Sequence, residues 1–350
     1  MGQHAGTHFK RGGEDADETL GNRLVIHNLV QEDTRTSFIK DLRHGLTAQP
    51  KRLPPKYFYD ELGSQLFEAI CLLPEYYPTR AENEILTRHA DEIADALDCT
   101  PVSLLELGSG SAVKTKRLIE ALLRRQDDLL YIPVDISQSA LEQSARVLLQ
   151  SYPNLRVTAY ASDYYTALVR VSETKDDRGC TLALFLGSNI GNFDAEEAQK
   201  FLRSLRSVLR AGDALLIGAD LKKQPEVLEA AYDDVLGITA AFNLNLLARI
   251  NREFDADFDL RAFKHVAVYN EPMGRIEMYI ESTRAQAVHI RQLEIEARFE
   301  PGERIHTENS YKYTVAELSS LAISTGWTLG DTWLDGAERF SSNLFIAVAD

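Results

Sequence analysis

The sequence predicts an α/β protein in which a doubly wound parallel sheet is joined to a second, α+β domain. Apolar runs typical of buried strands alternate with helical patterns between residues 102 and 217. The first of these runs ends in a Gly-Ser-Gly turn at 108–110, just before the first helical pattern. After Asp220 the alternation stops, and strand-like runs follow one another without helices between them. Alternation is typical of parallel sheets, whereas consecutive strands are typical of antiparallel ones.

Composition limits the possible partners. The 350 residues carry a net charge of −15, which argues against nucleic acid or an anionic membrane surface as a partner. No apolar stretch approaches the roughly 20 residues that cross a bilayer, and no signal-peptide core opens the chain. We therefore expect a cytoplasmic monomer that acts on a small molecule. The scattered Cys71, Cys99 and Cys180 predict buried thiols rather than disulfides, metal ligands or a nucleophile.

The first 80 residues contain a polar tail followed by two unusual tyrosine clusters. Residues 1–21 are rich in Gly, His, Asp and Glu and have no hydrophobic period, so they predict a disordered tail. An unstructured polar end explains His4 and His8 better than a metal site does, and no metal is expected. The proline-bounded tyrosine clusters follow at 53–63 and 74–80.

The remaining elements follow in order along the chain. Helical spacing from 81 to 97 precedes the main sheet. The expected strands of this sheet are 102–107, 130–134, 157–160, 182–186 and 214–217, and the helices between them are 114–125, 138–150 and 195–210. Pro225 then opens a long helical stretch toward Phe254, with a bend near Gly237. The expected antiparallel strands are 265–269, 276–282, 288–290 and 295–299, and a helix at 315–325 and strands at 327–333 and 344–349 return to the main sheet.

These elements divide the chain into two predicted domains. The first, formed by 81–222 and 313–350, is expected to bind a cofactor. The second, formed by 22–80 and 223–312, is expected to bind the substrate. The acceptor site should lie at the junction between them, where ligand pockets commonly form.

The Gly-Ser-Gly turn is typical of sites that hold a nucleotide-like cofactor against backbone N–H groups. Asp135 ends the next strand, where the ribose hydroxyls would lie. Val113 stands where the dinucleotide fingerprint has a third glycine, which disfavours NAD and leaves S-adenosylmethionine (SAM). Asp163 could accept the adenine amine beside Tyr164, or it could cap a helix. Lys114, in the first turn of the next helix, could contact the cofactor carboxylate or be a solvated surface lysine.

The loop at 184–193 should face the transferable group, because ligands lie beyond the carboxyl ends of strands in open α/β sheets. Its two asparagines could bind a ligand or could only shape the turn. Asn192 is the better candidate for a ligand contact, because it lies further out on the loop.

Several segments together resemble the L-histidine Nα-methyltransferase family, which makes the trimethylated betaine hercynine in ergothioneine biosynthesis. The segments are 53–60, 73–80, 106–111, 185–193, 275–278 and 306–313. The resemblance extends from about residue 35 to residue 350. It implies a class I SAM-dependent methyltransferase fold, with a Rossmann-like doubly wound sheet and an α+β substrate domain.

The resemblance also implies roles for individual residues. The residues that would hold SAM are Gly108, Lys114, Asp135, Asp163 and Tyr164. Those that would hold L-histidine are Tyr76, Asn192 and Tyr232 (the last two at its carboxylate), and Glu308 and Ser310 at its imidazole ring. Tyr59 would face the α-amine as the catalytic residue. Aromatic walls suit an amine that must be neutral to attack and becomes a quaternary cation, through cation–π attraction of about 0.5–2 kcal/mol.

Three other functions compete with this one. A methyltransferase for another amino acid, such as tryptophan, would be expected to lack the Glu308 and Ser310 pair. An NAD-dependent oxidoreductase is disfavoured by Val113 and by the lack of a placed proton donor. A non-catalytic SAM-binding protein would not need the acceptor-side residues. Taken singly, the tyrosines could be core aromatics and Glu308 an edge-strand charge, but as a set they favour the enzyme.

Overall fold

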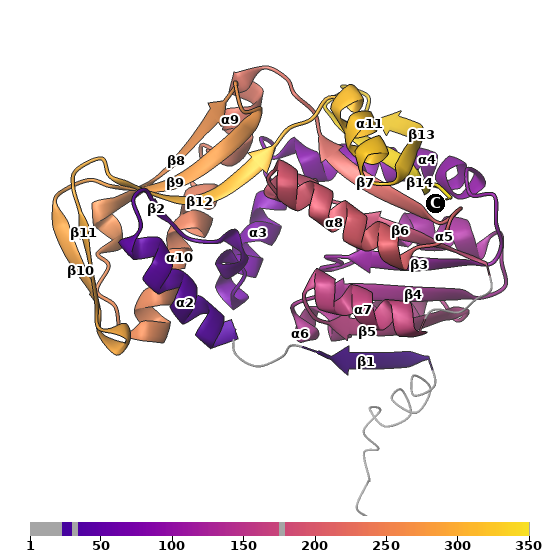
Figure 1. The fold of residues 1–350 in the computed structure, drawn as a ribbon, viewed down its shortest axis with the longest axis horizontal. Coiled ribbons are helices and arrows are strands. Elements are labelled where there is room, and N and C mark those ends of the chain that lie inside the picture. Colours follow the sequence, from indigo (N-terminus) through magenta and orange to yellow (C-terminus); the bar gives the residue numbers. More distant parts are fainter. Residues whose placement is uncertain (1–22, 30–33, 175–178, 350) are drawn as a thin grey trace, which may run out of the picture.

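The computed structural model describes residues 23–29, 34–174 and 179–349, so the predicted tail at 1–21 lies outside the described residues. Its largest element is an eight-stranded sheet with helices on both faces (Figure 1). The strands are β1 (Leu24–Asn28), β3 (Val102–Leu107), β4 (Leu129–Asp135), β5 (Leu155–Ala161), β6 (Cys180–Phe185), β7 (Ala214–Asp220), β13 (Trp327–Leu334) and β14 (Phe340–Ala347). Their spatial order is β1-β5-β4-β3-β6-β7-β14-β13.

This order confirms the doubly wound α/β fold. From β3 the chain builds outward through β4 to β5, and it then returns to the other side of β3 to add β6 and β7, all in parallel. The strand order therefore reverses between β3 and β6, where ligands bind in such sheets. β14 and β13 complete the sheet as antiparallel strands.

The predicted domain division needs one correction at its start. β1 pairs in parallel with β5 at the edge of the large sheet, so residues 24–28 belong with the main sheet rather than with the second domain. The strand has five residues, of which none is buried and two are exposed, so its hydrophobic pattern is too short to reveal this pairing. The rest of the division stays a prediction.

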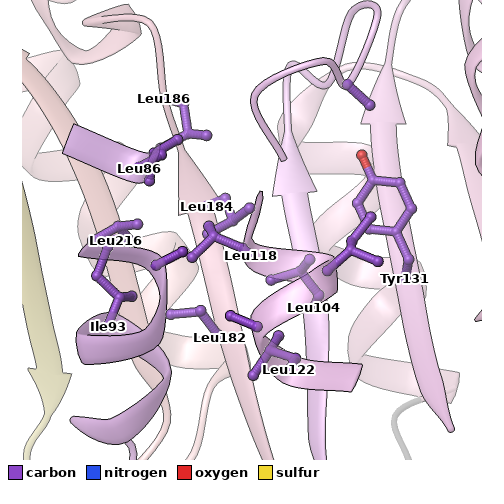
Figure 2. Packing of buried hydrophobic residues seen from close by; sticks show 14 of the residues in the cluster. Leu86, Ile93, Leu104, Leu118, Leu122, Tyr131, Leu182, Leu184, Leu186 and Leu216 are labelled. Carbon is purple, nitrogen blue, oxygen red and sulfur yellow. The ribbon is translucent and has the colours of Figure 1, made fainter. Parts of the chain in front are cut away.

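Two hydrophobic clusters hold helices against the two faces of the large sheet. The helices are α4 (Tyr77–Asp95), α5 (Lys116–Leu123), α6 (Gln138–Ser151), α7 (Tyr164–Thr174), α8 (Ala195–Val208) and α11 (Val315–Ser324). Figure 2 shows one face, where Leu86 and Ile93 of α4 and Leu118 of α5 meet leucines of β3, β6 and β7. Burial of each such side chain contributes about 1.5–3 kcal/mol to the stability of the fold. The strands whose ends form the site are therefore held in a well-packed core.

A smaller sheet and its helices lie beside the large sheet (Figure 1). The helical segments are α2 (Thr34–Thr47), η1 (Pro55–Phe58), α3 (Glu61–Leu72), α9 (Pro225–Tyr232), α10 (Ile238–Phe254), η3 (Leu260–Ala262) and η4 (Arg291–Leu293). The strands are β2 (Lys51–Arg52), β8 (Phe263–Asn270), β9 (Arg275–Ser282), β10 (Gln286–Ile290), β11 (Ile295–Phe299) and β12 (Arg304–Tyr311). The four-stranded sheet has the order β2-β12-β9-β8, and β10 pairs with β11. The expected bend is the break between α9 and α10, where Gly237 has a φ of +73°.

The cysteine prediction was wrong for two of the three residues. Cys99 and Cys180 form a disulfide, with their Cα atoms 6.1 Å apart, and Cys71 is free. Cys180 begins β6 opposite Val102 of β3, so the pairing follows from strand neighbours that the sequence spacing did not reveal. Within the described residues no helix is long and apolar enough to span a membrane, and no group of three or more metal-binding side chains occurs.

Candidate active site

The Gly-Ser-Gly turn lies at the carboxyl end of β3 and is tied to the end of β4. Gly108 and Gly110 have φ values of +77° and +48°, in the left-handed region that glycine adopts without strain. A Cβ atom on Gly108 would lie 2.9 Å from the Tyr164 hydroxyl. The Gly110 N–H donates to Asp135 Oδ2 at 2.9 Å, and the Ser137 N–H donates to Asp135 Oδ1 at 3.0 Å. The turn and Asp135 therefore form one unit.

Asp163 and Tyr164 lie at the start of α7, a helix that the sequence did not predict. Asp163 caps this helix, because its carboxylate accepts the Thr166 N–H at 3.1 Å and the Thr166 hydroxyl at 2.7 Å. The capping alternative is thus realised, and the adenine contact stays a prediction. The Tyr164 ring meets Phe185 edge-on, with the centroids 5.6 Å apart.

Lys114 lies in the turn before α5 rather than in its first turn, which corrects the predicted position. Its ammonium forms an ion pair with Glu82 of α4, a carboxylate with no exposed surface. The other contact of Glu82 is the Gly187 N–H, at 2.8 Å and 3.0 Å from its two oxygens. Burial opposes the charge on Lys114, but Glu82 outweighs burial and raises the pKa of Lys114. Lys114 is therefore a paired lysine, and its buried partner Glu82 also binds Gly187, which lines the cavity described next.

A cavity opens beside the turn. Its lining includes every residue predicted for the acceptor side, namely Tyr59, Tyr76, Asn192, Tyr232, Glu308 and Ser310. Asn189 also lines it, and the Asn189 amide nitrogen would lie 3.2 Å from a Cβ atom on Gly108. The cavity is therefore adjacent to the glycine turn. The role of each residue stays a prediction.

Aromatic rings form one wall of this cavity. Tyr59 follows η1 and meets Phe67 and Phe242 edge-on, at centroid distances of 5.6 Å and 5.7 Å. Tyr76 precedes α4 and meets Tyr232 edge-on at 6.1 Å. Burial raises the pKa of Tyr76 well above its ordinary value, so its ring is a neutral phenol. Phe67 and Phe242 were not predicted, because apolar residues on helices look like core residues.

The floor of the cavity is a hydrogen-bonded pair backed by a buried charge. Tyr232 ends α9, and its hydroxyl lies 2.7 Å from Ser310 Oγ on β12. The Lys312 ammonium donates to Tyr232 Oη at 2.9 Å and to Ser310 Oγ at 2.8 Å. Lys312 also pairs with Asp220 at 2.8 Å, and both side chains have no exposed surface. Burial opposes the charge on Lys312, but Asp220 outweighs it and raises the pKa of Lys312.

Glu308 faces the cavity from β12, next to the β-bulge that follows His306. Among the described residues, no hydrogen bond or ion pair engages its carboxylate. Burial raises the pKa of Glu308 to about 7, and the charge of Lys312 acts in the opposite direction. An unpaired carboxylate with a shifted pKa in a cavity is typical of a binding or catalytic site.

Comparison with known proteins decides the family. Residues 38–347 match the family described as histidine-specific methyltransferase, SAM-dependent. The chain belongs to this family. Histidine N-alpha-methyltransferase of Mycolicibacterium smegmatis is 42% identical to it over 332 residues, which cover 92% of this chain and 99% of that protein. The protein of the same name from Mycobacterium tuberculosis is 40% identical over 323 residues, with the same coverage.

A fungal protein is also similar to this histidine-specific methyltransferase. Ergothioneine biosynthesis protein 1 of Schizosaccharomyces pombe is 32% identical over 276 residues. The match covers 77% of this chain and 35% of the fungal protein.

The residues at the ends of β3 and β4 fit SAM. The space beside Gly110 is open, with no atom within 4 Å of its Cβ position, so a ligand can approach the backbone there. Asp135 accepts two backbone N–H groups, and a carboxylate has further lone pairs for ribose hydroxyls. When bound, SAM supplies the electrophilic methyl group.

Proposed function

We propose that this methyltransferase transfers three methyl groups in turn to the α-amine of L-histidine, and thereby forms hercynine for ergothioneine biosynthesis. The observation that carries the proposal is the unpaired Glu308 carboxylate, which lines the same cavity as Ser310 and the tyrosines. A protonated imidazole ring has two N–H donors. Glu308 would accept one of them and Ser310 Oγ the other, which leaves the free hydroxyl proton of the Tyr232–Ser310 pair for the carboxylate.

The same pair argues against tryptophan, the principal alternative acceptor. Indole offers one donor and no acceptor, so it would leave one of the two polar groups without a partner. A buried polar group without a partner costs about 1–3 kcal/mol, which makes a site built for two hydrogen bonds reject such a ligand.

The cavity wall suits repeated methylation of one nitrogen. In each transfer the nitrogen lone pair forms the new N–C bond as the S–C bond breaks, and the first two products each lose a proton before the next transfer. Tyr59 and Tyr76 bring aromatic faces to the amine, which do not hold its proton as a carboxylate would. The same faces attract the growing cation, with about 0.5–2 kcal/mol from cation–π contact.

We further propose that the enzyme acts as a cytoplasmic monomer. Native mass spectrometry of the purified protein checks the oligomeric state, and cell fractionation checks the compartment.

The experiment that tests the function is incubation of the purified protein with SAM and each amino acid, followed by mass spectrometry. We expect a mass gain of three methyl groups on histidine alone. Methylation of another amino acid with histidine unchanged would overturn the histidine assignment. Binding of SAM without methylation of any acceptor would support the non-catalytic alternative.

A further inference from the structure

Lys312 lies directly behind the acceptor cavity but does not line it. Its ammonium has no exposed surface, and all three of its N–H groups have partners. These partners are Asp220 Oδ2 at 2.8 Å, Tyr232 Oη at 2.9 Å and Ser310 Oγ at 2.8 Å. Two of the three are hydroxyl oxygens of residues that face the cavity.

These contacts determine where the protons of the Tyr232 and Ser310 hydroxyls can point. Tyr232 Oη and Ser310 Oγ each accept from Lys312, so neither can donate back to it. They lie 2.7 Å apart, and one of the two protons occupies the bond between them. The other proton has only the cavity to point into. The pair therefore offers a ligand one O–H donor, whichever of the two hydroxyls supplies it.

The charge behind this pair is positive. Asp220 carries one negative charge, and it pairs with both Lys312 and Lys223, whose Nζ lies 2.6 Å from Asp220 Oδ1. The positive charge in contact with the pair is the Lys312 ammonium, which touches both hydroxyl oxygens, whereas Lys223 touches neither. A hydroxyl donor backed by a positive charge suits an anionic oxygen better than a neutral or cationic group.

Lys312 is more than a counter-charge for Asp220. That carboxylate already accepts the Tyr77 hydroxyl at 2.7 Å and the ammonium of Lys223. Lys223 has no contact with Tyr232 or Ser310; its other partners are the Tyr77 hydroxyl and the Leu221 carbonyl. Both lysines thus bind Asp220, but only Lys312 contacts residues that line the cavity.

We infer that Lys312 is a positioning residue that directs the free hydroxyl proton of the Tyr232–Ser310 pair at the carboxylate of the acceptor, and so makes the site selective for amino acids over the corresponding amines. The inference rests on the proposed function and adds the device that recognises the carboxylate.

The test compares L-histidine with histamine, which has the same imidazole ring and amine but no carboxylate. Steady-state kinetics with both acceptors are measured for the wild type, Lys312→Met and the matched control Lys223→Met. We expect Lys312→Met to lower kcat/KM for histidine at least about tenfold, mainly through KM, and to leave histamine within about twofold. Lys223→Met should keep the wild-type ratio of histidine to histamine.

Two further measurements separate this role from a structural one. Calorimetric binding of S-adenosylhomocysteine should be unchanged in Lys312→Met, which shows that the variant is folded. If Lys312→Met does not fold, Lys312→Gln, which keeps two N–H donors without the charge, should lower the ratio about threefold or more. A wild-type ratio in the folded Lys312 variant, or an equal loss in Lys223→Met, overturns the inference.

Failure of the proposed function is visible separately, in the wild type alone. If the wild type methylates another amino acid, the comparison is made with that amino acid and its decarboxylated amine. The inference then stands only if Lys312→Met removes the preference for the carboxylate. A wild type that acts on no amino acid overturns both proposals.

Discussion

Glu308 is the side chain in this cavity whose surroundings differ most from those of an ordinary surface carboxylate. It is partly buried, it lines a cavity with aromatic and hydroxyl groups, and no described residue pairs with it. Surface carboxylates lose little when their partners are removed, because water replaces the partner. A carboxylate in a cavity gains its partner from the ligand, so its effects should appear in substrate binding.

Replacement of Glu308 by alanine should therefore act on the acceptor. We expect Glu308→Ala to raise KM for histidine at least about tenfold, because a charge-assisted hydrogen bond to the imidazole N–H is lost. The affinity for SAM should not change. Steady-state kinetics and calorimetry check both values, with Glu296→Ala, at an exposed side chain of β11, as the control. Unaltered histidine kinetics would remove Glu308 from the acceptor site.

The pKa of Glu308 predicts a dependence on pH. Burial raises this pKa to about 7, and the proposed contact needs the ionised carboxylate. The contribution of Glu308 should thus be present above about pH 7 and lost as the pH falls below it. The measurement is the ratio of kcat/KM between the wild type and Glu308→Gln from pH 5 to pH 9, in which the ionisations of the substrate cancel. We expect the ratio to rise up to about pH 7 and then level off, and a flat ratio would contradict the prediction.

The glycine turn is the element whose shape leaves the least freedom for substitution. Gly108→Ala places a Cβ atom 2.9 Å from the Tyr164 hydroxyl at a φ of +77°, so we expect the affinity for SAM to fall about tenfold or more. Gly212 is a matched control, because its φ is +87° and no atom lies within 4 Å of its Cβ position. Gly212→Ala carries the same backbone strain but should leave SAM binding unchanged, as calorimetry can check. Equal losses in the two variants would show that strain alone is responsible.

Glu82 of helix α4 links Lys114, on the turn before α5, to Gly187, which lines the acceptor cavity. Removal of its charge leaves Lys114 without its anion and weakens the hold on the Gly187 N–H. We expect Glu82→Gln to lower the free energy of unfolding by about 1–3 kcal/mol and to weaken both SAM and histidine binding. Urea denaturation and calorimetry measure these effects. The control is Glu84→Gln on the same helix, at a carboxylate that is 44% exposed and pairs with Arg88. If only the free energy of unfolding changes, Glu82 does not affect the binding of either ligand.

Elements were predictable where the hydrophobic pattern was strong. The buried strands β3 to β7 are nearly continuous apolar runs, and they were found within a few residues of their ends. β12 was missed because it alternates polar side chains on both faces, with Glu308 and Ser310 directed at the cavity and His306 bonded to Asn309. α7 was missed because tyrosine, valine and threonine make its sequence resemble a strand.

At the scale of the whole molecule, the residues that line the cavity were predictable, but the buried residues behind them were not. The tyrosines and the Glu-x-Ser pair belong to sequence segments with a family resemblance, and the fold brings them to one cavity. Asp220 ends β7 and Lys312 follows β12, so they meet only after both sheets have formed and spacing along the chain carries no sign of their contact. The same reason explains why the pairing of Cys99 with Cys180 was not predicted.

Asp220 also lies where the chain passes between the two sheets. It ends β7 of the large sheet, and its carboxylate binds Tyr77 at the start of α4, Lys223 before α9 and Lys312 after β12. Next to it, the Tyr313 N–H donates to the Asp220 carbonyl at 3.0 Å, and the Lys222 N–H donates to the Tyr313 carbonyl at 2.9 Å. Three of the connections between the two sheets, α3 to α4, β7 to α9 and β12 to α11, thus meet at one carboxylate. Because these contacts share one buried carboxylate, loss of its charge should loosen three connections between the sheets together.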